Sequence, residues 1–152
     1  MRRWRRHHAQ AGRCLLCDEL SREQKSGRRI VLQQSGFLLY TPFGGPISGE
    51  MILAPLRHAA DFGAEDDGAL SRISGLLLSA VKRLYAALGD PSYNLVLQTW
   101  PKGRQQDEAL HWYLRIIPRR ASFGGFELAT GDLVSTMTPE DAAALYREAS
   151  IT

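Results

Sequence analysis

The sequence predicts an α+β domain: a largely antiparallel sheet of about five strands, with one long helix and a C-terminal helix on one face. Three observations support this fold class. Several apolar runs have the short length of strands, one longer segment has apolar residues at helical spacing, and glycine or proline separates these segments. The chain has 152 residues, 44% of them hydrophobic, which is enough for one domain with a sizeable core.

The first three strands are predicted from short apolar runs. Residues 29–33 and 36–41 flank turn-forming residues and should pair as a hairpin. The prolines and glycines of residues 41–46 cannot continue a ladder. An apolar run at residues 50–55 then predicts a third strand that ends near His58.

A long helix is predicted over residues 69–88, because apolar residues recur there every three or four positions. These positions are Leu70, Ile73, Leu77, Val81, Leu84 and Leu88. Asp66 and Asp67 can cap the start of the helix. Gly89 supplies a left-handed exit and Pro91 a stop.

The last part of the chain predicts two more strands and a second helix. The strands cover residues 93–99 and 111–117, and a polar loop over residues 100–109 joins them. A glycine-rich segment follows at residues 123–127. Thr138, followed by a proline, then predicts the start of the C-terminal helix.

The excess of positive charge lies mainly at the start of the chain. There are 19 basic and 16 acidic residues, and residues 1–13 are rich in arginine. We expect these thirteen residues to form a disordered basic tail before a domain at residues 14–152. The tail could contact nucleic acid or an anionic membrane, but no mixed aromatic and basic pattern recurs downstream. With no apolar segment long enough for a signal peptide or a bilayer span, the expected location is the cytoplasm, without a membrane partner.

The chain has two cysteines, Cys14 and Cys17, in a C-x-x-C motif. In a reducing compartment such a pair favours metal binding or redox chemistry over a structural disulfide. A zinc site needs two further ligands, and His58 and His111 are candidates because both lie at predicted strand ends. The alternatives are a redox dithiol, or cysteines and histidines that only pack or form hydrogen bonds.

Several longer motifs occur in a fixed order. They are Cys14-Leu-Leu-Cys17, Pro55-Leu-Arg-His58, Pro91-Ser-Tyr-Asn-Leu-Val-Leu, His111-Trp-Tyr-Leu-Arg-Ile-Ile-Pro-Arg119, Gly125-Phe-Glu127 with a following Gly131, and Thr138-Pro-Glu140. From Cys14 to about Ala149 the chain therefore resembles the histidine-triad (HIT) superfamily. More narrowly, it resembles the C-terminal half of galactose-1-phosphate uridylyltransferase-like proteins. The resemblance implies a HIT-like fold and a zinc ion held by Cys14, Cys17, His58 and His111.

The chain departs from active members of this superfamily at one strand. Alternation along the strand predicts that His111, Tyr113 and Arg115 share one face, with Trp112 and its alternate neighbours in the core. The resemblance implies that active enzymes carry three histidines on the first face, and that the middle one attacks the α-phosphorus. Tyr113 holds that middle position and Arg115 the third, so no catalytic residue is assigned. A phenol with a pKa of about 10 is mostly protonated at neutral pH. The alternative is that Arg115 lowers this pKa and permits a tyrosyl-nucleotide route.

Three residues are candidates for substrate binding: Gln98, Arg115 and Glu127. The resemblance implies that the glutamate in Gly-Phe-Glu binds a hexose phosphate, and that the position of Gln98 contacts phosphate or ribose. Glu127 could instead pair with Arg119 or Arg120, and Gln98 could be an exposed polar strand residue.

These observations favour a zinc-binding domain that binds a nucleotide or sugar phosphate but lacks the nucleophilic histidine and is not catalytic alone. The alternative is a nucleotidyltransferase of galactose metabolism, transferring uridylyl groups between hexose phosphates, or a nucleotide hydrolase. Either would act with a partner chain. A further alternative is an interaction module. The resemblance implies a homodimer or a separate partner like the N-terminal half, which carries a His-Pro-His sequence that this chain lacks.

Overall fold

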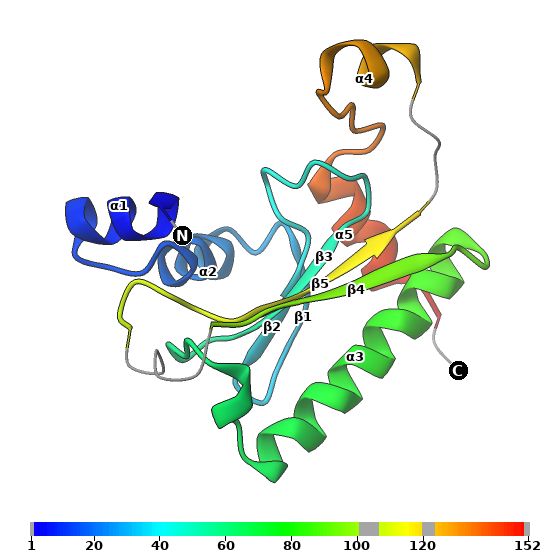
Figure 1. Cartoon of the computed structure of the whole chain (residues 1–152). Helices are drawn as coiled ribbons and strands as arrows, with labels where there is room; N and C mark the ends of the chain where they lie inside the picture. Colours follow the sequence, from blue (N-terminus) through cyan, green and yellow to red (C-terminus); the bar gives the residue numbers. More distant parts are fainter. Residues whose placement is uncertain (1, 101–106, 120–123, 151–152) are drawn as a thin grey trace.

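A five-stranded antiparallel sheet forms the centre of the protein in a computed structural model that describes residues 2–100, 107–119 and 124–150. The strand order is β1-β2-β3-β5-β4 (Figure 1). The strands are β1 (Ile30–Gln34), β2 (Phe37–Tyr40), β3 (Met51–Pro55), β4 (Tyr93–Gln98) and β5 (Tyr113–Pro118). The predicted α+β class with an antiparallel sheet is confirmed.

Strands β1 and β2 form the predicted hairpin, with Gln34 paired to Phe37 across the turn. The two central turn residues, Ser35 and Gly36, have φ values of 53° and 83°. Positive φ at both positions is the pattern of a type I′ turn, whose twist matches that of the flanking strands. Glycine suits this conformation because it has no Cβ to clash.

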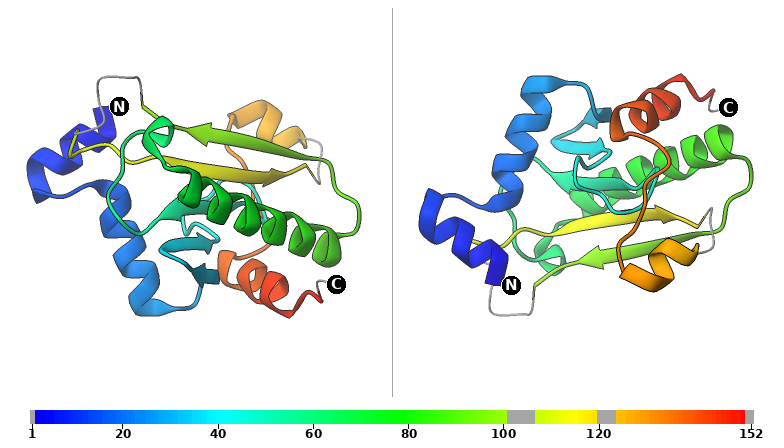
Figure 2. Two further views of the ribbon diagram at one scale, coloured as in Figure 1. Left: turned by 90° about the horizontal axis from the view of Figure 1, so that it is seen from below. Right: turned by 90° about the horizontal axis from the view of Figure 1, so that it is seen from above.

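Helices cover both faces of the sheet, although the sequence analysis expected them on one face. The face of Leu39, Leu53 and Trp112 packs against α3 (Asp67–Leu88) and α5 (Pro139–Glu148). The opposite face, which includes Leu38, Tyr40 and Ile52, packs against α2 (Leu15–Ser26) and contains the functional residues described below. Figure 2 shows α3 crossing one side of the strands.

The predicted long helix is α3 (Asp67–Leu88). The Asp66 side chain caps it by accepting a hydrogen bond from the Ala69 N–H at 2.6 Å. The buried residues are Ala69, Ile73, Leu76, Ala80 and Leu84, so the buried stripe is displaced from the predicted one. Leu70, which was predicted to be buried, lies at the edge of this stripe and is 38% exposed. Gly89 has the expected positive φ, but its ψ of −150° lies outside the left-handed helical region.

The C-terminal helix α5 (Pro139–Glu148) begins as predicted, with the Thr138 side chain accepting a hydrogen bond from the Asp141 N–H. The buried Tyr146 hydroxyl donates to the Gly49 carbonyl at 2.7 Å, which fixes α5 to the segment before β3. A short 3₁₀ helix, η1 (Phe62–Ala64), precedes α3. Another short helix, α4 (Gly125–Thr130), overlaps the glycine-rich segment of residues 123–127 and extends beyond it.

Two helices at the start of the chain were not predicted. Arg2–Ala11 form α1, where we expected a disordered tail, and Leu15–Ser26 form α2. Leu16 and Leu20 of α2 are buried against the sheet. No helix in the described ranges is long and apolar enough to cross a membrane.

Candidate functional site

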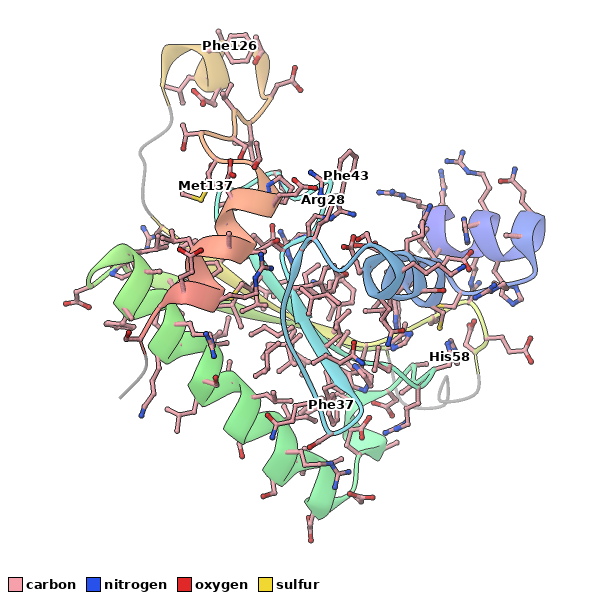
Figure 3. The ribbon with its side chains drawn as sticks, turned by 180° about the vertical axis from the view of Figure 1, so that it is seen from behind. Arg28, Phe37, Phe43, His58, Phe126 and Met137 are labelled. Carbon is pink, nitrogen blue, oxygen red and sulfur yellow. The ribbon has the colours of Figure 1, made fainter. Side chains whose placement is uncertain are left out.

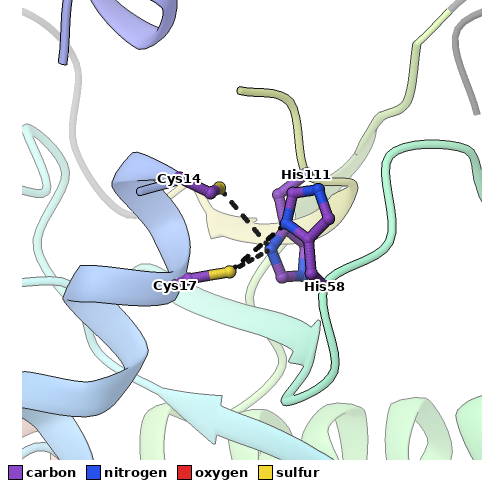
Figure 4. A group of neighbouring side chains, drawn as sticks. All are labelled: Cys14, Cys17, His58 and His111. Carbon is purple, nitrogen blue, oxygen red and sulfur yellow. Dashed lines mark hydrogen bonds between the residues drawn. The ribbon is translucent and has the colours of Figure 1, made fainter. Parts of the chain in front are cut away.

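The four predicted metal ligands lie together at one end of the sheet (Figure 4). Cys14 caps the start of α2 and Cys17 lies in its first turn. His58 follows β3, and His111 precedes β5 rather than lying within it as predicted. One ligand atom from each residue lies within 4.8 Å of the other three, so the group could hold a metal ion.

The spacing of the ligand atoms fits a tetrahedral site. The distance from Cys14 Sγ to His111 Nδ1 is 3.8 Å, and Cys17 Sγ lies 3.4 Å from Nδ1 of both His58 and His111. Bonds of about 2.0 to 2.3 Å to zinc at tetrahedral angles would put a sulfur and a nitrogen about 3.6 Å apart. The donor set and its geometry therefore fit zinc.

Both histidines have their outer ring nitrogen held by a backbone carbonyl. His111 Nε2 donates to the Pro55 carbonyl at 3.1 Å, and His58 Nε2 donates to the Asp107 carbonyl at 3.4 Å. Since a carbonyl only accepts, the proton lies on Nε2 in each ring and the Nδ1 lone pair is free. A histidine that binds a metal through Nδ1 requires this protonation state, with Nε2 held by a hydrogen bond.

The two thiols interact in the absence of a metal. A hydrogen bond from Cys17 to the Cys14 sulfur lowers the pKa of Cys14, and it raises the pKa of Cys17. The pair can therefore lose a first proton readily, whereas a bound cation would be needed to stabilise both thiolates. Neither cysteine is in a disulfide.

The predicted division of the faces of β5 is confirmed. Trp112 is fully buried on the α3 side, whereas Tyr113 packs with the α2 cluster. Gln98 pairs with Tyr113 across β4 and β5, so these two side chains lie on the same face. Arg115 lies two residues after Tyr113, on the same face of β5. Its guanidinium forms a bidentate pair with the Glu50 carboxylate, with distances of 2.5 and 3.1 Å.

A cavity of about 440 Å³ opens beside Tyr113 and Arg115. Its walls come from α1, α2, the segment before β3, and strands β3 and β5. Phe43, labelled in Figure 3, lies at the edge of the cavity and is 75% exposed. The Arg29 guanidinium lies 5.2 Å from the Phe43 ring centroid. Polar and aromatic groups thus meet in a hollow of the size that small ligands occupy.

The phenol of Tyr113 is partly buried. Burial raises the pKa of Tyr113, and this effect outweighs the opposing influence of the Arg115 charge. Arg115 does act to lower this pKa, but the net shift is a rise, so the structure does not favour the tyrosyl-nucleotide alternative. The Trp4 ring also stacks on the Tyr113 ring, which restricts access to it.

Glu127 is not part of this cavity. It lies in α4, and its carboxylate accepts a hydrogen bond from the Gly124 N–H at 2.9 Å. Figure 3 shows Phe126, the neighbouring residue, at the opposite end of the molecule from His58. The alternative pairing with Arg119 is not observed, and Arg120 lies outside the described residues.

The residues of the site that sequence reasoning missed include Arg3, Trp4 and Glu50. A tryptophan within an arginine-rich run was the available signal for Trp4, because an aromatic residue in such a run can pack while its neighbours stay solvated. Glu50 directly precedes a buried strand, and no local pattern links it to Arg115, which lies 65 positions later.

Comparisons with known proteins agree on a family. No family model matches the chain. An ADP-glucose phosphorylase from Arabidopsis thaliana is 32% identical over 145 residues, which are 94% of this chain and 40% of that protein. The structure of a GalT-like (galactose-1-phosphate uridylyltransferase-like) protein from the same plant has a TM-score of 0.84 at 30% identity, covering 98% of this chain and 48% of the other.

The chain is a half-length GalT-like domain of the histidine-triad type. An Arabidopsis thaliana ADP-glucose phosphorylase with bound ADP-glucose has a TM-score of 0.83 at 30% identity, covering 97% of this chain and 47% of that one. A Zn-bound histidine-triad protein from Mycobacterium smegmatis shares the fold, with a TM-score of 0.58 at 18% identity, covering 90% of this chain and 91% of the other. The GalT-like domain thus spans less than half the length of the curated relative.

Proposed function

We propose that this GalT-like domain binds zinc, holds a nucleotide or sugar phosphate in the cavity beside Tyr113, and does not catalyse nucleotidyl transfer alone. The observation that carries this proposal is the identity and burial of Tyr113. It stands where active histidine-triad enzymes are expected to have their nucleophile, and burial raises its pKa. A phenol that stays protonated is a poor nucleophile at neutral pH.

Zinc would be held by Cys14, Cys17, His58 and His111. Four protein ligands leave no open coordination position, which is typical of structural rather than catalytic zinc. The ion would join the start of α2 to the ends of β3 and β5, three segments far apart in the sequence. In a reducing compartment such as the cytoplasm, both cysteines would stay available for the metal.

The ligand would be a nucleotide or sugar phosphate that contacts Arg115 in the cavity. It would extend past Tyr113 to reach Gln98, which pairs with Tyr113 but does not line the cavity. The ADP-glucose bound by an Arabidopsis relative supports this class. Arg115 has a fixed orientation, because both oxygens of the buried Glu50 carboxylate hold its guanidinium. Its remaining N–H groups could contact a phosphate oxygen.

A partner chain is the second part of the proposal. Strand β4 lies at the edge of the sheet, and its Leu95 and Leu97 are 45% and 40% exposed. An apolar edge strand favours pairing with another chain, either a second copy or a chain like the N-terminal half. Glu127 does not line the cavity of its own chain. It would therefore reach a ligand only in the site of such a partner.

A nucleotidyltransferase or phosphorylase that works with a histidine-bearing partner is the second candidate function. The half-length match to an ADP-glucose phosphorylase favours it. In that enzyme, the present chain would supply the zinc-stabilised scaffold and the sugar-phosphate contacts, while the partner would supply the nucleophile.

The test combines metal analysis with binding and turnover assays on the purified chain. We expect a single zinc per chain, binding of ADP-glucose in calorimetry, and no phosphorolysis of ADP-glucose or uridylyl transfer from UDP-glucose to galactose 1-phosphate. Tyr113→Phe should leave binding unchanged. Turnover by the pure chain that is lost in Tyr113→Phe would overturn the non-catalytic proposal and make Tyr113 the nucleophile.

A further inference from the structure

The cavity beside Tyr113 contains an excess of positive charge. The charged residues that line it are Arg3, Glu19, Arg22, Glu23, Arg29, Glu50 and Arg115. Two of these arginines are neutralised within the wall. Arg29 pairs with the buried Glu23 at 2.8 Å, and Arg115 pairs with the buried Glu50. These two arginines therefore add little net positive charge.

The remaining arginines, Arg3 and Arg22, form no ion pair with a carboxylate in the part of the chain that the structure describes. The nearby Glu19 accepts a hydrogen bond from the Tyr40 hydroxyl at 2.9 Å. Arg22 uses its Nε to donate to the Asp18 carbonyl of its own helix. Among the described residues Arg3 finds no such hydrogen-bond partner, so its guanidinium is available to an anion.

Helix α1 has a defined position, although none of its residues is fully buried. The Trp4 ring stacks on Tyr113 and meets the Trp100 ring edge to face, with centroids 6.0 Å apart in both pairs. Arg5 forms an ion pair with Asp107 at 3.2 Å. Because Arg3 directly precedes Trp4, these contacts place it at the opening of the cavity, where its side chain lines the wall and stays exposed to solvent.

We propose that α1 is part of the ligand site, and that the Arg3 guanidinium binds a phosphate group of the ligand next to Tyr113. The inference rests on the proposed function, and it assigns the phosphate contact to a helix that precedes the C-x-x-C motif. An unpaired guanidinium presents several N–H donors in a planar fork that matches phosphate oxygens. The sugar and base would lie farther along the cavity, toward Phe43 at its edge.

The test compares ADP, adenosine and inorganic phosphate as ligands in calorimetry at one fixed ionic strength. Arg3→Ala should weaken ADP binding about tenfold and leave adenosine binding unchanged, since only ADP carries the phosphates. Arg3→Lys should lose less ADP affinity than Arg3→Ala, because lysine keeps the positive charge but lacks the planar fork of guanidinium N–H donors. Arg6→Ala is the matched control: it removes the same charge from an exposed position of α1 that does not line the cavity.

Each outcome separates this inference from the proposed function. Equal ADP affinity in Arg3→Ala and the parent chain, or equal losses in Arg3→Ala and Arg6→Ala, would overturn the role of Arg3 alone. A parent chain that binds neither ADP nor adenosine would overturn the proposed function and this inference with it. Inorganic phosphate that binds as tightly as ADP, and weakens equally in Arg3→Ala, would support the Arg3 site but reject a nucleotide as its ligand.

Discussion

The indole of Trp4 and the phenol of Tyr113 are stacked, with ring centroids 6.0 Å apart and an angle of 12° between their planes. The two residues lie more than a hundred positions apart in the sequence. Their contact joins the N-terminal helix to the strand that carries the candidate site, and it covers the ring that replaces the expected nucleophile. Docking of α1 and access to Tyr113 are therefore coupled.

Trp4→Ala should detach α1 from the sheet. We expect the free energy of unfolding to fall by about 1 kcal/mol, because a stacked aromatic pair contributes about that amount beyond its buried area. Tyr113 should also become more reactive toward a tyrosine-nitrating reagent. Urea denaturation followed by circular dichroism and peptide mass spectrometry measure the two effects.

Trp4→Phe is the control for this prediction, since it keeps a ring at the same position. It should retain most of the stability and most of the protection of Tyr113. If Tyr113 in Trp4→Ala reacts no faster than in the parent chain, α1 does not shield the phenol.

Cys17→Ser should abolish stoichiometric zinc binding and lower the free energy of unfolding by several kcal/mol. Cys17 Sγ contacts both histidine nitrogens, so its loss removes a ligand from the centre of the group. Binding of a structural metal to the folded chain contributes directly to folding free energy. Metal analysis and chemical denaturation of zinc-loaded samples would measure these changes.

Chelation provides an internal control for this comparison. In excess chelator, the parent chain and Cys17→Ser should have nearly equal stabilities, because neither then holds the ion. A stability difference that persists without metal would mean that Cys17 acts through packing or its hydrogen bond to Cys14.

The sequence predicted those parts of the fold whose signals are local. Helix α3 has both a helical apolar repeat and a capping aspartate, and the β1-β2 hairpin has turn residues suited to positive φ. Helix α2 was missed because its buried positions are Leu16, Leu20 and Glu23. The third position of its apolar stripe is a glutamate, which is buried only because Arg29 neutralises it.

The candidate site was predictable only where a motif marked it. The C-x-x-C pair and the two histidines could be found in the sequence, and the structure brings all four together. Helix α1 has no buried residue, so its sequence shows no apolar periodicity from which a helix could be predicted. Its position depends on contacts to Tyr113 and Asp107, and distant contacts of this kind leave no pattern in a single sequence.

Leu95→Glu should weaken self-association if β4 is the edge that pairs with a second copy. A charge on an edge strand opposes strand addition, because it would be buried in the new interface. Light scattering after size-exclusion chromatography should show a shift from dimer toward monomer over a concentration series. Leu78→Glu is the control, as it puts the same charge on an exposed leucine of α3, away from this edge strand. Equal masses for Leu95→Glu and the parent chain at every concentration would exclude this edge as the interface.

The ion pair between Arg29 and Glu140 should make stability depend on acid pH. The hydrogen bond from Arg29 lowers the pKa of Glu140 below its ordinary value of 4.5, and the two groups are 2.6 Å apart. A depressed folded-state pKa means that the unfolded chain binds the proton more tightly. The stabilising contribution is therefore fully present above about pH 4.5, and it is lost as the pH falls through the lower folded-state value.

Glu140→Gln should remove this part of the pH dependence. At neutral pH the variant should be less stable than the parent chain, because Glu140 joins the first turn of α5 to the start of β1. The two unfolding free energies should converge as the pH falls through the lowered folded-state pKa of Glu140, where the parent carboxyl also becomes neutral. Glu148→Gln, at an exposed position of the same helix, corrects for the general effect of losing a negative charge. Urea denaturation at a series of pH values measures the curves, and parallel curves for Glu140→Gln and the parent chain down to low pH would show that this ion pair does not hold α5 in place.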